Sequence, residues 1–178
     1  MLQICQPMAD NAAAGGSDRG KGYIFSRSGT TWTEIDTITG SDIEDSEELG
    51  YAVDMSADGT YIITSSWKHN SQQGAAYIFK KSGTGWTQQA KLEASDGAIG
   101  ENSSRGAAYV FSRSGTTWTE QQKLTVSDAA ANDAFGLGIT MSADGRHVLI
   151  GAITEDGAGT DRGATYMFQR NDSTWTEI

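Results

Sequence analysis

The sequence predicts an all-β fold, and three observations support that prediction. The chain has 178 residues with 22 glycines and a single proline, a composition typical of many tight turns between short strands. Several short segments alternate apolar and polar residues with a period of two, as strands with one buried face do. No longer segment shows the i, i+3, i+4 apolar spacing of an amphipathic helix.

Internal repeats are the strongest signal in the sequence. A Tyr-x-Phe motif recurs, and a Trp follows each of its tyrosines at constant spacing. The motif begins at Tyr23, Tyr77, Tyr109 and Tyr166, and the tryptophans are Trp32, Trp86, Trp118 and Trp175. Ser-Asp follows the first three tryptophans, at Ser41-Asp42, Ser95-Asp96 and Ser127-Asp128. We expect the aromatic rings to lie in the core, because residues i and i+2 of a strand share a face.

A second block of sequence occurs twice, at residues 49–66 and 135–152. In its first copy we expect a strand over 50–56, a turn at 57–59 and a strand over 61–66. A polar loop over 68–73 follows, and then strands over 75–80 and 86–92 with a Ser-Gly turn between them.

Four antiparallel strands in a repeat of about 50 residues are the signature of a β-propeller blade. The repeat register predicts about thirteen strands in one incomplete propeller segment, 1–178, of about three to four blades. Its predicted parts are a partial blade 1–48, a blade 49–95, a half blade 96–128 without its first two strands, and a blade 129–178.

These residues resemble a known family. From residue 135 onward the chain contains, in order, Phe135-Gly136, Met-Ser-Ala-Asp-Gly, Gly151-Ala152 and Gly-Ala-Thr-Tyr-Met-Phe. This series resembles an FG-GAP repeat, the unit of integrin α-chain β-propellers and their bacterial and viral relatives. The copy beginning at Leu49-Gly50 departs further from that pattern. The resemblance implies a β-propeller, an extracellular or cell-surface location, and a role in protein binding or adhesion.

The resemblance also implies calcium, which many FG-GAP repeats bind through a D-x-D-x-D-G turn between their first two strands. Here the corresponding turns are 56–59 and 142–145, each Ser-Ala-Asp-Gly with one carboxylate. Calcium needs six to eight oxygen ligands, so we expect hairpin turns and no cofactor.

Charge and composition limit the classes of partner. The 13 basic and 23 acidic residues give a net charge of -10, which argues against nucleic acid and anionic membranes. No apolar run is long enough to insert into a bilayer, and the first residues do not resemble a signal peptide. Cys5 is the only cysteine, so no disulfide forms within the chain.

Three rim loops, 42–48, 68–73 and 153–162, are the candidate binding surface, because they diverge where the strands repeat. Their candidate residues are Asp42, Glu44, Asp45, Lys68, His69, Glu155 and Asp156, with Glu47 and Glu48 completing the acidic run. The competing interpretation is that the acidic run is a solvated loop without a ligand. Asp128 and Asp133 lie in the equivalent loop of the next repeat, and the same interpretation makes His69 and His147 plain surface residues.

We therefore expect a non-enzymatic repeat scaffold that binds a protein or glycan. Two alternatives remain open at this point. One is a structural piece of a larger surface or fibre protein, whose open strand edges invite self-association. The other is a propeller-based glycan-processing enzyme, which needs paired carboxylates facing each other across a pocket.

Overall fold

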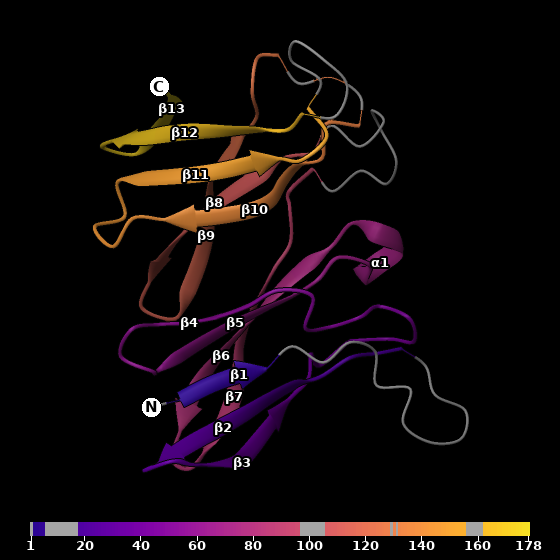
Figure 1. Ribbon diagram of the computed structural model, residues 1–178, viewed down its shortest axis with the longest axis vertical. Coiled ribbons are helices and arrows are strands. Elements are labelled where there is room, and N and C mark those ends of the chain that lie inside the picture. The colour runs from indigo at the N-terminus through magenta and orange to yellow at the C-terminus, as the bar shows by residue number, and fades with distance from the viewer. Residues whose placement is uncertain (1, 6–17, 97–105, 129, 131, 156–161) are drawn as a thin grey trace. The chain divides into compact units, whose positions relative to one another are not determined.

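The computed structural model describes residues 2–5, 18–96, 106–128, 130, 132–155 and 162–178, with the side chains of 2–5 left aside. The chain forms two compact units, Met1–Ile99 and Gly100–Ile178, and each is treated by itself below (Figure 1). The described residues contain thirteen strands and one short helical turn, so the predicted all-β class is confirmed. None of the described helical residues forms a segment suited to crossing a membrane.

The first unit contains two antiparallel sheets. One sheet joins β1 (Leu2–Cys5), β2 (Gly22–Ser28) and β3 (Thr31–Ile38) in chain order. The other joins β4 (Val53–Met55), β5 (Tyr61–Ser66), β6 (Ala75–Ser82) and β7 (Gly85–Leu92), with α1 (His69–Gln72) between β5 and β6. The first strand of this four-stranded sheet is shorter than predicted, and the other three agree within two residues.

The second unit also contains two antiparallel sheets. A two-stranded sheet joins β8 (Ala108–Ser114) and β9 (Thr117–Leu124). A four-stranded sheet joins β10 (Phe135–Met141), β11 (His147–Ala152), β12 (Ala164–Asn171) and β13 (Thr174–Glu177). The described sheets of three, four, two and four strands have the strand numbers predicted from the repeat register, and they are consistent with two four-stranded propeller blades and two incomplete ones.

In the first unit, the aromatic motif of the four-stranded sheet fills the space between the sheets. Tyr77 and Phe79, the two outer residues of the motif in β6, are almost fully buried. They share one core with Ile24 and Ile38 of the three-stranded sheet, and Ile24 is itself the middle residue of the preceding Tyr-x-Phe motif. The tyrosine and phenylalanine of one Tyr-x-Phe motif therefore pack toward the middle residue of the motif before it.

The second unit repeats this packing. Phe168 and Trp175 are buried in a core with Ala108 and Leu124 of the two-stranded sheet. Val110, the middle residue of the motif in β8, packs against the same core. Burial of this apolar area is the main force that holds the two sheets of each unit together.

The tryptophans do not all lie in the core, which corrects one prediction. Trp175 is buried and Trp86 packs against the core of its unit, whereas Trp32 is exposed. Trp32 and Trp118 belong to the first sheet of their respective units and lie under the guanidinium groups of Arg27 and Arg113. Only the second sheet of each unit turns this aromatic face toward the shared core.

A short parallel β-bridge joins the two sheets of each unit and explains why an Arg-Gly sequence precedes both β2 and β8. Gly20 bridges Leu49, and Gly106 bridges Phe135. A Cβ atom on Gly20 would lie 2.0 Å from the Leu49 carbonyl oxygen, and one on Gly106 would lie 1.9 Å from that of Phe135. The Arg-Gly sequence before β2 and β8 therefore needs glycine, because the next sheet's backbone occupies the place of a side chain.

Candidate binding site at the loop ends of the first unit

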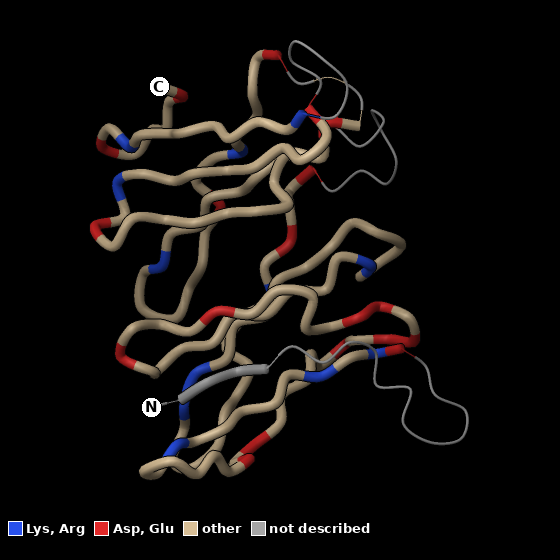
Figure 2. The backbone as a smooth tube through the Cα atoms, in the orientation of Figure 1, with Lys and Arg blue, Asp and Glu red and all other residues tan. Residues whose placement is uncertain are grey.

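Two loops that are distant in sequence meet around the carboxylate of Glu47. The backbone amides of Glu44 and Asn70 donate to this carboxylate at 2.8 and 2.9 Å, and His69 Nδ1 lies 2.9 Å from it. The Ser66 hydroxyl donates to the Glu47 carbonyl oxygen. Glu47 therefore fastens the β3–β4 loop to the β5–β6 loop, and Figure 2 shows the acidic run in red between β3 and β4.

The β5–β6 loop contains a left-handed turn. Asn70, Ser71 and Gln72 have φ values of 49°, 59° and 74°, in a region that costs most side chains about 1 kcal/mol or more each. The turn is closed by the Gln72 amide on the Lys68 carbonyl at 3.1 Å and the Gly74 amide on the His69 carbonyl at 3.1 Å. This backbone path carries the His69 ring inward, where only 6% of the residue is exposed.

A polar network surrounds the His69 ring. The Tyr77 hydroxyl donates to Asp42 Oδ1 at 2.9 Å and lies 3.3 Å from His69 Nδ1. Lys91 Nζ donates to Asp42 Oδ2 at 2.8 Å, pairs with Glu93 Oε1 at 3.0 Å and lies 3.4 Å from His69 Nε2. Asp42 thus connects the loop after β3 to β6 and β7 of the next sheet.

The surroundings keep the network charged. The hydrogen bond from Lys91 is the main cause that lowers the pKa of Asp42. Burial opposes ionisation of Glu47, but its hydrogen bonds from two amides and His69 still lower the pKa of this carboxyl. Burial, reinforced by the Asp42 carboxylate, raises the pKa of the Tyr77 hydroxyl. Both carboxylates are therefore ionised at neutral pH beside a protonated phenol.

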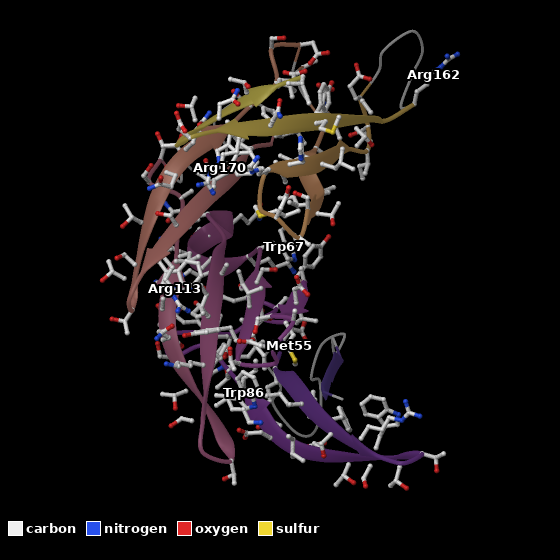
Figure 3. The ribbon with its side chains drawn as sticks, turned by 90° about the vertical axis from the view of Figure 1, so that its left-hand side faces the viewer. Met55, Trp67, Trp86, Arg113, Arg162 and Arg170 are labelled. Carbon is white, nitrogen blue, oxygen red and sulfur yellow. The ribbon has the colours of Figure 1, made fainter. Side chains whose placement is uncertain are left out.

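An exposed aromatic surface lies next to this network. We call Tyr51, Trp67, Glu48 and Lys68 the aromatic ledge. The Tyr51 and Trp67 rings lie 6.0 Å apart at 55°, and the two residues are 47% and 42% exposed. Trp67 Nε1 donates to Glu48 Oε2 at 3.0 Å, and Lys68 Nζ pairs with Glu48 Oε1 at 2.5 Å. Figure 3 labels Trp67.

The structure brings some of the predicted site residues together. Asp42 and His69 lie in the network, and Lys68 lies beside it in the aromatic ledge. Glu44 contributes its backbone amide, and Asp45 pairs with Arg19 at 2.6 Å on the surface.

The remaining predicted site residues belong to the second unit. Glu155 lies there, half-buried. Asp156 and the rest of the loop up to 161 fall outside the described residues. The third predicted rim loop is therefore described only in part.

The competing interpretation was wrong for His69 and for one member of the acidic run, Glu47. His69 was predicted as a surface residue, but the left-handed turn buries it against Glu47 and Tyr77. The acidic run was interpreted as a solvated loop, and Asp42, Glu44 and Asp45 are exposed. Glu47 alone departs from that interpretation, because donors from both loops satisfy its buried carboxylate.

Sequence reasoning missed Tyr51, Trp67, Tyr77 and Lys91 as parts of this site. A signal existed for Tyr77, because Ser-Asp recurs in register with Tyr-x-Phe. The second unit confirms that relation: the Tyr166 hydroxyl hydrogen bonds to Asp128, and burial together with this bond raises the pKa of Tyr166 to about 12. The motif tyrosine of one sheet thus binds the aspartate that follows the preceding sheet.

The second unit carries different residues at the centre of the equivalent site. An offset of 86 residues places Asp133 at the position of Glu47 and Glu155 at that of His69. Asp133 is buried, and its carboxylate accepts the Ala130 amide at 2.5 Å. The Tyr–Asp pair is therefore a repeated structural feature, whereas the histidine network belongs to the first unit.

The turns that the family resemblance associates with calcium do not fit the ion. Asp58 accepts the Ser56 hydroxyl at 2.6 Å and both the amide and the hydroxyl of Thr60, which hold its pKa at about 2. Asp144 accepts the Ser142 hydroxyl in the same way, and its pKa is also lowered. Each carboxylate closes its own hairpin turn. The described residues contain no cluster of three or more His, Cys, Asp or Glu arranged for a metal ion.

Comparison with known families agrees with the fold. The model of the FG-GAP repeat matches residues 32–79 and 118–168, together more than half of the chain. The chain therefore belongs to the FG-GAP repeat family, as the motifs predicted. Each match runs from the last strand of one sheet into the first three strands of the next, so the Tyr–Asp pair lies within one sequence repeat. No curated protein matches the chain.

Proposed function

We propose that this protein is a non-enzymatic binding scaffold whose aromatic ledge receives a protein or glycan partner, in an adhesive role at a cell surface. The single observation that carries the proposal is the exposed pair Tyr51 and Trp67, in which a hydrogen bond to Glu48 holds Trp67. Exposed aromatic rings with a polar edge supply large contact area at little entropic cost, and they are enriched where proteins bind partners. A net charge of -10 favours a partner other than nucleic acid.

The electrostatics of the neighbouring network favour binding over glycoside hydrolysis. Hydrolysis needs one carboxyl with a raised pKa as the general acid and a second carboxylate across the scissile bond. Asp42 and Glu47 both have lowered pKa values, and each is engaged by donors of the protein. Their role is to hold the two loops that present the aromatic ledge.

The proposal is tested with a labelled chain on a glycan array and against a phage-displayed random-peptide library. Trp67→Ala should weaken any selected interaction by about tenfold or more, the usual effect of removing an aromatic anchor. Trp32→Ala is the matched control, since Trp32 is also exposed in the first unit but lies at the β2–β3 hairpin. Selected ligands that tolerate Trp67→Ala, or that lose equal affinity with Trp32→Ala, would refute the proposal.

A further inference from the structure

The core face of β10 carries an apolar stripe that no described element covers. Ile139 and Met141 pair directly with Ile150 and Val148 of β11. Directly paired residues of an antiparallel sheet lie on the same face, and Ile150 and Val148 are buried in the core of the second unit. Ile139 and Met141 nevertheless remain 56% and 53% exposed.

The first unit shows what covers the equivalent stripe there. Val53 and Met55 of β4 pair with Thr64 and Ile62 on the core face, and both are half-buried. Met55 packs against the core of that unit. β1 lies against β4, next to β2 in the facing sheet (Figure 1).

Among the residues that the structure describes, the two-stranded sheet of the second unit has no strand at the position of β1. In the described part of the chain, β8 pairs with β9 alone, although β8 carries the same Tyr-x-Phe motif as β2, β6 and β12. Each of those three strands pairs antiparallel with a preceding strand, β1, β5 and β11 respectively. Within the described ranges, the open side of β8 and the uncovered stripe on β10 therefore correspond to the one position that β1 occupies in the first unit. We call this position the gap.

We propose that this gap binds an extended strand of the β5 type, donated by an FG-GAP repeat of another polypeptide. Such a strand adds antiparallel to the free side of β8, by the main-chain pairing of β-augmentation. Its alternate side chains face the stripe on β10, as the buried Ile62 and Thr64 of β5 face the core of their own unit. This surface is separate from the aromatic ledge, and the inference does not depend on the proposed function.

The probe is a fluorescent peptide of residues 60–66, added to the full chain and followed by polarisation. Ile139→Asn combined with Met141→Asn should weaken its binding by about tenfold or more, because two apolar contacts are lost. Leu149→Asn is the matched control and should change affinity by less than about twofold, since Leu149 is exposed on the opposite face of the same sheet. Lysines in place of Ile62 and Thr64 of the peptide should abolish binding.

Hydrogen exchange supplies the second readout. Saturating peptide should slow exchange of the amides of 108–114, and the doubly substituted chain should lose this protection. Protection at 22–28 would mean that the peptide replaces β1, and it would overturn the proposal. So would equal binding to wild type and the double variant, or no binding at all. A wild-type dimer that the double substitution dissociates would show that a second copy occupies the gap, and would also overturn it.

Discussion

Replacing Gly20 by alanine tests the parallel bridge between the two sheets of the first unit. Gly20 has a φ of +74°, and a Cβ atom there would lie 2.0 Å from the carbonyl oxygen and 2.7 Å from the nitrogen of Leu49. The bridge must therefore open, with loss of the hydrogen bonds from the Glu48 and Leu49 amides to the carbonyls of Asp18 and Arg19.

The expected cost follows from these contacts. A positive φ costs alanine about 1–2 kcal/mol, and the two hydrogen bonds contribute about 0.5–1.5 kcal/mol each. Gly20→Ala should therefore lower the free energy of unfolding by about 2–5 kcal/mol. Gly29→Ala is the control, because Gly29 has a φ of +59° but nothing within 4 Å of its Cβ position. It should cost about 1–2 kcal/mol at most.

Urea unfolding of the full chain measures both variants. The positive φ costs both variants about the same, so they differ by the two hydrogen bonds, about 1–3 kcal/mol. With a slope of about 2 kcal/mol per molar urea, the Gly20→Ala midpoint should lie about 0.5–1.5 M below that of Gly29→Ala. Gly106→Ala and Gly115→Ala repeat the comparison in the second unit, because a Cβ atom on Gly106 would meet Phe135 whereas one on Gly115 would have nothing within 4 Å. Equal midpoints for Gly20→Ala and Gly29→Ala would refute the close approach of the two backbones.

Three further predictions concern the network of the first unit and the packing of the second unit. Folding lowers the pKa of Glu47 below 4.5, so its contribution to stability is lost as pH falls below about 4.5. Glu47→Gln should therefore reduce the fall of the thermal unfolding midpoint between pH 6 and pH 3. An unchanged pH dependence of the midpoint would contradict this. In urea unfolding, Ile150→Ala should lower the free energy of unfolding by about 2–5 kcal/mol. Ile139→Ala, its cross-strand neighbour on the same face, should lower it by less than about 1 kcal/mol. Similar losses for the two variants would mean that the stripe on β10 is covered. The Gln122 side chain donates to the Trp175 carbonyl and accepts from the Trp175 amide, both at 2.8 Å. Gln122→Ala should therefore lower the free energy of unfolding by about 1–3 kcal/mol. No change in a calorimetric unfolding scan would contradict this contact.

Much of the fold was predictable because the repeat fixes the strand register. Glycine turns and period-two alternation located β5 to β7 within two residues. The short interval between Tyr77 and Tyr109 predicted the two-stranded sheet that β8 and β9 form in the described part of the chain. The face that each aromatic side chain occupies was less predictable, since it depends on which sheet has a neighbour. The exposed Trp32 and the buried Trp175 share the same local sequence, Thr-Trp-Thr-Glu, except at the residue before it.

The candidate site was predictable only in outline. The acidic run and the polar loop were recognised as rim loops, and Asp42 and His69 do lie together. Burial of His69 depends on positive φ values at Asn70 and Ser71. Glycine is the usual sequence signal for such a conformation, and neither position is a glycine. The exposed pair Tyr51 and Trp67 comes from two strand ends 16 positions apart that only the β4–β5 pairing brings side by side.

The central claim is that the Tyr-x-Phe residues of one sheet pack on the middle motif residue of the sheet before it. Methyl NMR with selectively labelled isoleucine and aromatic residues tests this most directly. The account predicts nuclear Overhauser contacts from the Ile24 methyl groups to the ring protons of Tyr77 or Phe79, which share its core. Ile24 methyl groups without contact to either ring, in a chain that remains folded, would contradict it.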